Sequence, residues 1–427
     1  MSLDDSIESE PEPAALITTP HDPYAALRLW NFRLYLVGNA LAIFGMQMQT
    51  AAVQWEVFER TRSKLMLGLI GLVQFIPVVA LTLPAGHQAD RSHRKVIVMI
   101  TMFSMAVCSL FLAWVSLTRG PVALMFVALF ISGVARAFLQ PAKASLLPHI
   151  VPREVFSNAV TWNMTGFQLA AIIGPAVCGQ IIAQAKVAWP VYVADALATF
   201  IFFALLSTVH VPRHAITATT ATGEALLAGF RFVCRNKVIL AAMTLDMFAV
   251  LLGGAVALLP VYADDILQVG PQGYGWLRTA PAVGALVFSF LLAHRPPIKH
   301  AGATLLWVVA GFGIATIVFG YSRSYSLSLL MLFLTGAFDI VSVVIRHTLV
   351  QLLTPDEMRG RVSAINSVFI GASNELGAFE SGLIAEMFSP LISVVSGGAG
   401  TLLVVAVIAW LWPELRRYGS LQESTRR

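Results

Sequence analysis

The sequence predicts an all-α membrane protein with twelve transmembrane helices in two pseudo-symmetric six-helix bundles. Hydrophobic residues make up 57% of the chain and charged residues 12%, whereas soluble domains average about 25% charged residues. The apolar residues also gather into runs of about 20, the length a helix needs to cross a hydrocarbon core about 30 Å thick. An internal repeat, described below, relates the two halves.

The apolar runs place six spans in each half of the chain. Those of the first half are expected at 34–58, 66–83, 96–117, 122–139, 160–185 and 191–209, and those of the second at 238–262, 274–292, 303–321, 325–349, 362–388 and 391–412. Residues 1–32 are acidic and proline-rich, which predicts a disordered tail. The bundles then occupy 33–210 and 238–413, joined by a cytoplasmic linker over 211–237 with an amphipathic helix. Residues 414–427 form a cytoplasmic C-terminal tail.

The basic residues predict the orientation of the chain. The segments on the side of the N-terminus hold basic clusters such as Arg91, Arg94 and Lys95, whereas the loops on the other side hold few basic residues. Lys and Arg in short loops are retained on the cytoplasmic side. Both termini should therefore be cytoplasmic, in a multi-pass protein of the cell inner membrane. The formal charge of +5 fits loops that lie against an anionic leaflet and requires no nucleic acid.

The two halves share an internal repeat. An offset of 203 residues places Gly133 on Gly336 without gaps, and the same offset matches further residues. These are Lys143 with Arg346, Pro152 with Pro355, Glu154 with Glu357, Asn163 with Asn366, Gly174 with Gly377 and Gly179 with Gly382. Spans four and five thus recur as spans ten and eleven in the same orientation, as a parallel repeat of six spans requires.

Ionisable residues inside the spans are candidates for function because a charge in the bilayer is costly without a partner. Those near the span centres are Arg136, Asp195, Asp246, Arg278, Asp339, Glu375 and Glu380. The repeat places Arg136 and Asp339 at equivalent positions with opposite charge, which suggests an ion pair across a central cavity. In the alternative interpretation, each pairs with a neighbour in its own half as a structural strut.

Helical spacing suggests which faces line such a cavity. Met46, Gln49, Val53 and Glu56 fall on one stripe of the first span, and Asp246, Gly253, Pro260 and Asp264 fall on one stripe of the seventh. The residues predicted to serve substrate binding or proton coupling are Arg136, Asp246, Asp339, Glu375, Gln49 and Glu56. Plain helix packing is the alternative explanation of both stripes.

The loop between spans two and three carries a recognisable motif. Residues 86–95 read GHQADRSHRK, which resembles the G-x-L-A-D-R-x-G-R-K signature of the major facilitator superfamily. The resemblance covers about residues 33–412 and implies that superfamily's fold. It also implies a cytoplasmic gate formed by Gly86, Asp90, Arg91 and Arg94, latched against span eleven. An ordinary basic loop is the alternative. Gln88 and His93 depart from the pattern.

Span five resembles the Gly-Pro motif of exporters in this superfamily. Gly174, Pro175 and Gly179 could form a hinge, since Pro removes a helical hydrogen bond, or could serve helix packing alone. Residues 226–232 and 354–361 further resemble the branch that contains enterobactin exporters and multidrug efflux proteins. These resemblances imply a monomeric transporter.

The sequence therefore predicts a proton-coupled secondary transporter that exports a small amphipathic molecule, siderophore-like or drug-like, by alternating access. The coupling carboxylate would be Asp246, Asp339 or Glu375, whose protonation alternates with substrate binding. A nutrient importer or lysolipid flippase of the same fold is an alternative, and a non-transporting receptor or scaffold is another. No enzyme, cofactor or metal is expected: the sequence has no phosphate-binding loop, HExxH or CxxC, and Cys108, Cys178 and Cys234 lack metal-ligand spacing.

Overall fold

The computed structural model describes residues 22–91, 93–211, 223–296 and 298–419, and these residues are helical with no β-strand. The predicted tail at 1–32 lies mostly outside this part of the chain. Eleven helical segments are long and apolar enough to cross a membrane. The remaining predicted span, the eleventh in chain order, lies in α13 (Asp356–Met387), which is long but carries Asn374, Glu375 and Glu380 inside its apolar stretch.

The N-terminal bundle holds the first six spans. After the short η1 (Ala26–Arg28), it comprises α1 (Trp30–Thr61), α2 (Lys64–Arg91), α3 (Arg94–Leu117), α4 (Val122–Ile150), η2 (Arg153–Val155), α5 (Phe156–Ala185) and α6 (Trp189–Thr208). α1 packs against α5 and α6, α3 against α4 and α6, and α2 against α4. Each predicted span of this half therefore lies on one helix.

The C-terminal bundle follows the linker helix α7 (Gly223–Arg235). It comprises α8 (Lys237–Leu252), η3 (Ala255–Leu258), α9 (Leu259–Val261), η4 (Tyr262–Ile266), α10 (Gly270–Ala293), α11 (Ala301–Tyr321), α12 (Tyr325–Leu353), α13, α14 (Pro390–Leu411) and α15 (Pro413–Arg416). α10 and α11 pack against α12, while α8 and α14 flank α13.

Span seven is broken in its middle, where the sequence predicted a continuous helix over 238–262. α8 ends at Leu252, and Gly253 and Gly254 separate it from 3₁₀ and π turns. A Cβ on Gly253 would meet the Phe312 ring at 2.7 Å, and one on Gly254 would meet the Gly377 carbonyl oxygen at 2.5 Å. Neighbouring helices thus approach the break so closely that a side chain would not fit. Broken helices at mid-membrane often border transport sites.

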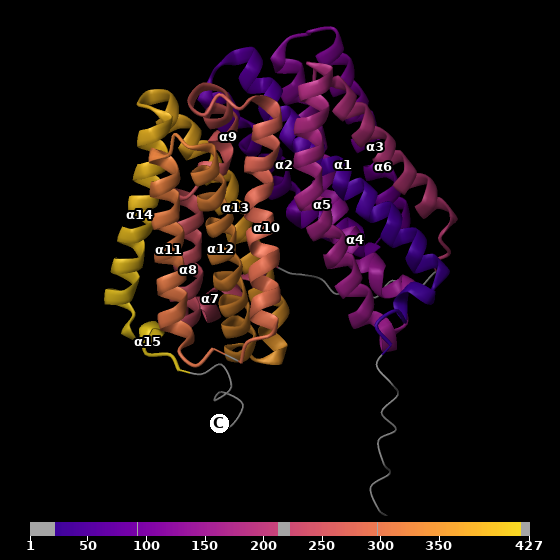
Figure 1. Ribbon diagram of the computed structural model, residues 1–427. Coiled ribbons are helices and arrows are strands. Elements are labelled where there is room, and N and C mark those ends of the chain that lie inside the picture. Colours follow the sequence, from indigo (N-terminus) through magenta and orange to yellow (C-terminus); the bar gives the residue numbers. More distant parts are fainter. Residues whose placement is uncertain (1–21, 92, 212–222, 297, 420–427) are drawn as a thin grey trace, which may run out of the picture.

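The bundles contact each other mainly through α2 with α13 and α5 with α10. Backbones meet at both crossings: a Cβ on Gly179 would lie 3.0 Å from the Gly275 Cα, and one on Gly382 would lie 3.0 Å from the Gly68 Cα. Figure 1 shows the bundles close together at the top and diverging toward the bottom, where α7 and α15 lie. We call the bottom the terminal side, because α1 begins and α14 ends there, and the top the opposite side.

Polar contacts reinforce the closure on the opposite side. Arg62, just after α1, forms ion pairs with Asp264 and Asp265 of η4. Glu386 of α13 accepts hydrogen bonds from the backbone N–H groups of Lys64 (2.6 Å) and Leu65 (3.2 Å) at the start of α2. A carboxylate at a helix N-terminus is favoured by the helix dipole. The two bundles are therefore joined on the opposite side.

Candidate functional site

A cavity of about 610 Å³ lies between the two bundles and receives residues from both. Its charged lining residues are Arg136 and Lys143 of α4, Arg278 of α10, Asp339 of α12 and Glu375 of α13. Gly253 and Gly254, at the break of span seven, also border it. Volumes of 300–1,000 Å³ are typical of small-molecule sites, so this cavity is the candidate binding site.

A seam of hydrogen bonds crosses between the bundles at this site. Arg278 of α10 donates to the Gln54 side-chain oxygen on α1. Tyr274, one turn earlier, donates to the same oxygen (3.1 Å) and to the Ala51 carbonyl (3.2 Å). Thr279 donates to the Ile172 carbonyl of α5 at 2.9 Å. Gln54 was not among the predicted site residues, because its partners come from the other half of the chain.

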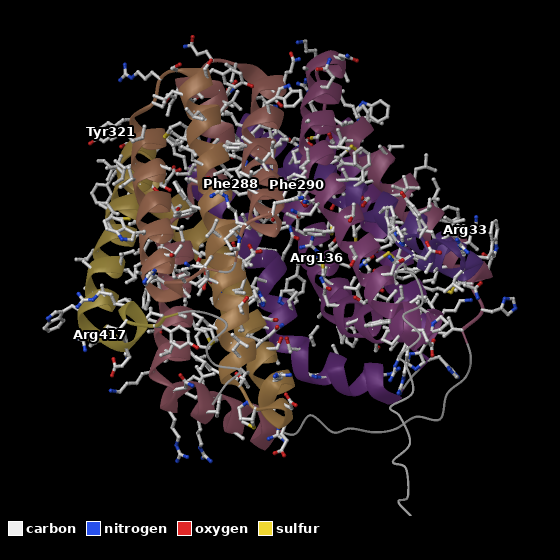
Figure 2. The ribbon with its side chains drawn as sticks, turned by 60° about the horizontal axis from the view of Figure 1, so that its bottom comes forward. Arg33, Arg136, Phe288, Phe290, Tyr321 and Arg417 are labelled. Carbon is white, nitrogen blue, oxygen red and sulfur yellow. The ribbon has the colours of Figure 1, made fainter. Side chains whose placement is uncertain are left out.

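Arg136 and Asp339 both line the cavity, as their equivalent positions in the repeat suggested. Among the described residues no ion pair joins them, and Arg136 instead lies in the electrostatic field of Glu375 and Asp195. Figure 2 places Arg136 in the interior, whereas Arg33, Tyr321 and Arg417 lie at the periphery. In this conformer Arg136 and Asp339 therefore both line the cavity but do not pair with each other.

Glu375 reaches from the C-terminal bundle to the N-terminal one. Its carboxyl group lies directly against Gly71 of α2, where a Cβ would stand 3.2 Å from the Glu375 Cδ and closer still to Oε2. Glu375 forms no ion pair with a cation in the described residues. It is therefore a carboxylate at the bundle interface, on the cavity wall.

Asp246 has a different environment from the other two predicted coupling carboxylates. It forms a buried ion pair with Arg346 of α12, in its own bundle, and it does not line the main cavity. Asp246 is therefore part of a strut within one half, a role that the sequence suggested only as the alternative for Arg136 and Asp339. Arg346 stands at the repeat position of Lys143, which lines the cavity and has no carboxylate at ion-pair distance in the described part of the chain.

Gln49 and Glu56 face away from the cavity, contrary to the predicted stripe. The lining residues of α1 are Ala42, Ile43, Met46, Gln47, Thr50 and Gln54, so the cavity-facing stripe is rotated from the predicted one. Both stripes contain Met46 and at least one glutamine, and spacing alone could not separate them. Gln49 donates to Ser109 of α3 at 2.7 Å, inside the bundle.

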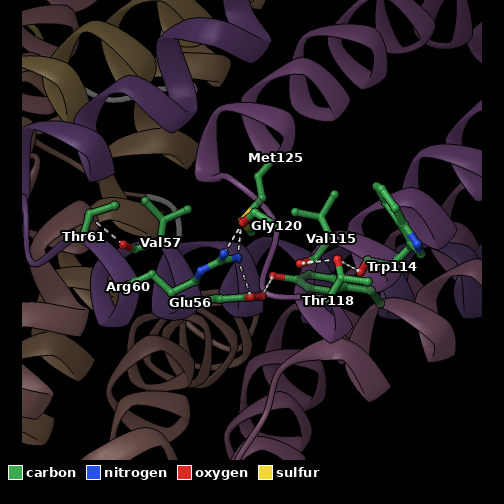
Figure 3. A network of polar contacts seen from close by, with 10 residues as sticks. Glu56, Val57, Arg60, Thr61, Trp114, Val115, Thr118, Gly120 and Met125 are labelled. Atoms are coloured by element: carbon green, nitrogen blue, oxygen red, sulfur yellow. Dashed lines mark hydrogen bonds and ion pairs between the residues drawn. The ribbon is translucent and has the colours of Figure 1, made fainter.

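Glu56 belongs to a network on the opposite side (Figure 3). It accepts hydrogen bonds from Tyr192 (2.8 Å) and Arg60 (3.2 Å), and Arg60 also donates to the Gly120 carbonyl and contacts the Met125 sulfur. The network ties α1 to α6 and to the loop between α3 and α4. Its role is to hold these helices together.

The loop motif can be followed only in part. The side chains of Asp90 and Arg91 lie outside the described residues. Gly86 has open space where a Cβ would lie, so no helix in the described residues approaches it closely. Arg94 donates to the Ser145 carbonyl at 3.5 Å and contacts His149 at 2.9 Å, both on α4. Arg94 therefore binds within its own bundle in this conformer, rather than to α13 as a latch would require.

The predicted hinge residues lie at contacts between helices. α5 runs without interruption through Pro175. Gly174 faces Gln47 of α1, while the Pro175 carbonyl and Gly179 lie against Gly275 of α10. The motif thus stands where the two bundles cross, and its packing role is visible in the contacts; its role as a hinge stays a prediction.

Comparison with known proteins identifies relatives over nearly the whole chain. Residues 21–426 match the family described as transmembrane secretion effector. The chain is 24% identical over 402 residues to the enterobactin exporter EntS of Shigella boydii serotype 4 and to that of Escherichia coli O1:K1, covering 91% of this chain and 93% of each relative.

Solved structures share the fold at low sequence identity. A bacterial homologue of the human lysosomal transporter Spinster, in an inward-facing and unoccupied conformation, superposes with a TM-score of 0.71 at 13% identity, covering 93% of this chain and 99% of its own. The nucleoside transporter NupG gives a TM-score of 0.68 at 14% identity, covering 91% and 100%. The fold is therefore that of the major facilitator superfamily, as the loop motif indicated.

The Asp246–Arg346 strut makes a stability prediction. Asp246→Ala leaves Arg346 buried without a partner, which should lower the free energy of unfolding by on the order of 3–5 kcal/mol. Arg346→Ala should act similarly, and the double variant should lose less than the sum, because a pair is removed together. Thermal unfolding in detergent measures all three. Glu414→Ala, which breaks an exposed pair with Lys237, is the control and should unfold like the parent. Strictly additive losses would show that the two residues do not stabilise each other.

Proposed function

Because the chain belongs to the transmembrane secretion effector family and has the fold of major facilitator transporters, we propose that it exports a small amphipathic molecule by alternating access, in exchange for protons. The observation that carries this proposal is the cavity itself. It lies between two pseudo-symmetric bundles, is bordered by a broken helix, and, within the described residues, is closed by ion pairs and a helix cap on the opposite side. If the bundles rock about the glycine crossings, the cavity closes on the terminal side and opens on the opposite side.

The direction of the opening follows from the basic residues. If the terminal side is cytoplasmic, as the distribution of Lys and Arg favours, this conformer is open to the cytoplasm and ready to load cargo. The membrane is then the inner membrane, both termini are cytoplasmic, and one chain suffices as a monomer, because the cavity is complete within it.

The lining suits a molecule with both apolar and polar parts. Met46, Phe167 and Phe312 supply apolar surface, while amides such as Gln54 and charges such as Arg136 supply fixed polar points. The relatives named enterobactin exporters favour a siderophore among such molecules.

Asp339 and Glu375 are the coupling carboxylates that we propose. Both line the cavity, and neither forms an ion pair with a cation in the described residues. Each can therefore exchange a proton with cavity water when substrate is absent. Asp246, paired with Arg346, is less suited, because protonation would leave a buried guanidinium without its counter-ion.

Export can be tested in inside-out membrane vesicles from a host that lacks its own exporters. We expect a proton gradient to drive uptake of a cargo drawn from siderophores, macrolides and dyes, and a protonophore to abolish it. Cells that accumulate the same compound only when the protein is present would indicate import instead. Binding without gradient-driven flux for any compound would favour a receptor.

The Arg136–Asp339 hypothesis has its own test. We propose that the two charges meet when the cavity closes on the terminal side. Arg136→Ala and Asp339→Ala should then each reduce transport at least tenfold, and the double variant should lose less than the product of the two effects. The charge swap, Arg136→Asp with Asp339→Arg, should restore assembly in the membrane. Independent, multiplicative effects would mean that the residues never meet.

The orientation predicts the labelling of added cysteines. A cysteine added at either terminus of a variant whose three native cysteines are replaced should resist an impermeant thiol reagent in intact spheroplasts and react after permeabilisation. A cysteine in place of Ser63, between α1 and α2, is the control and should react in intact spheroplasts. The reverse pattern would invert the protein in the membrane.

A further inference from the structure

A polar cluster lies inside the N-terminal bundle, behind the face of α1 that lines the cavity. Gln49 of α1 donates to the Ser109 hydroxyl of α3 at 2.7 Å, and 2.5 Å separates that hydroxyl oxygen from Oδ2 of Asp195 on α6. The three side chains are 8%, 1% and 3% exposed. Thr199, one turn after Asp195, has its hydroxyl within hydrogen-bonding reach of the same carboxyl group, and it also lines the cavity.

The second half of the protein builds the equivalent helix contacts without a carboxyl group at the mapped positions. The offset of 203 residues maps this cluster onto Leu252, Phe312, Gly398 and Leu402, which are all apolar or glycine. In the C-terminal bundle α11 packs against α14 much as α3 packs against α6 in the N-terminal one. The fold therefore does not require a carboxyl group at this place, and Asp195 calls for another explanation.

Among the side chains that the structure describes, no cation forms an ion pair with Asp195. Arg136 of α4 acts on it electrostatically but forms no ion pair with it. The helices α1, α3 and α5 pack against α6, and their titratable side chains are Arg33, Tyr35, Glu56, Glu59, Arg60, Arg94, Lys95, Cys108 and Cys178. Glu56 is bound to Tyr192 and Arg60, and Lys95 donates to the Ser207 and Val209 carbonyls. An ionised Asp195 would thus be a buried charge without a counter-ion, which is costly in a membrane.

The hydrogen-bond count around Ser109 favours the protonated acid. Ser109 has one hydroxyl proton and two lone pairs, and its oxygen lies near three groups: the Gln49 amide, the Met105 carbonyl (3.0 Å) and Asp195. If Asp195 is ionised, the single proton can serve either Met105 or Asp195. If Asp195 is protonated, it donates to Ser109, Ser109 donates to Met105, and Gln49 donates to Ser109, so all three contacts are satisfied.

The other carboxyl oxygen lies against α1. Oδ1 of Asp195 has no hydrogen-bond partner, and a Cβ on Gly45 would meet it at 2.6 Å. An unpartnered oxygen is tolerated better on a neutral acid than on an ion. Met46 and Gln47, next to Gly45, line the cavity, so a change of charge on Asp195 acts on a helix that shapes the binding site.

We propose that Asp195 is a proton-binding site, protonated in this conformer, whose proton holds α1 to α3 and α6. The proton leaves past the Thr199 hydroxyl to cavity water: the carboxyl O–H bond breaks and hydronium forms. The resulting carboxylate destabilises the contact with Gly45 and favours the alternative arrangement of the bundles. The proposal rests on the alternating access proposed above, but not on the identity of the cargo or on export.

The test measures conformation without cargo. The full chain, with its native cysteines replaced and spin labels at Ser157→Cys and Ser363→Cys on the terminal side of the two bundles, is placed in lipid nanodiscs. Pulsed electron spin resonance then gives the distance between the labels as a function of pH. We expect the distribution to shift with pH in the parent and to stay in its acid form at every pH in Asp195→Asn, an amide that mimics the neutral acid.

Controls separate Asp195 from other carboxylates. Asp356→Asn, at an exposed site, should keep the parental response. A parental response in Asp195→Asn would overturn the proposal. Infrared difference spectra provide a second readout: a carbonyl band of a protonated carboxylic acid should be lost in Asp195→Asn and kept in Asp356→Asn, and a band kept in Asp195→Asn would place the proton elsewhere.

A further variant keeps the proposal testable if Asp195→Asn does not assemble. Thr199→Val leaves the acid in place and removes the hydroxyl toward the cavity, so the pH-driven change should slow while its end points stay the same. An unchanged rate would refute this route. Because neither readout uses cargo or flux, failure of the export assay and failure of this proposal give different results.

Discussion

The close approach of backbones at the two bundle crossings is the constraint on which the rest of the structure depends. Gly179 against Gly275 and Gly382 against Gly68 bring α5 to α10 and α2 to α13 without intervening side chains. Small residues allow such contacts in membranes, where the hydrophobic effect does not drive helices together. With the bundles fixed there, the Arg62 ion pairs and the Glu386 cap can form on the opposite side, and the space left toward the terminal side is the cavity.

The two halves share this scaffold but not its chemistry. Gly179 and Gly382 are repeat partners, and each contacts the first turns of a helix from the other half. The charges differ: Arg136 corresponds to Asp339, and Lys143 to Arg346. Duplication explains the symmetric rocking geometry, whereas a transporter that couples cargo to protons needs different groups at the two ends of its cavity. Two halves with the same backbone arrangement but different charges meet that requirement.

The sequence predicted the features that depend on local composition. Runs of apolar residues located the spans, because the bilayer demands length and hydropathy from each helix separately. The repeat gave the two-bundle arrangement and placed Arg136 and Asp339 on the cavity. Helical spacing could not distinguish two neighbouring polar stripes of α1. Gln49 and Glu56 were therefore assigned to the cavity, whereas they face away from it. The adjacent glycines at 253–254 were the available signal for the break in span seven, but only the approach of Phe312 and α13 explains why the helix ends there.

Partners across the fold decide what each buried acid can do. Asp246, Asp339 and Asp195 are chemically the same side chain, and in sequence each is a lone aspartate in an apolar run. Asp246 meets Arg346 and becomes a strut, since its charge is already neutralised. Asp339 lines the cavity, where we propose that water and cargo compete for it. Asp195 meets a serine and a glycine backbone and forms no ion pair in the described part of the chain, so a proton is the partner that removes its charge most simply. A buried acid in the bilayer can therefore be stabilised in three ways: by a neighbouring cation, by water in a cavity, or by binding a proton. Contact with cavity water and proton binding are the two that can change during a transport cycle.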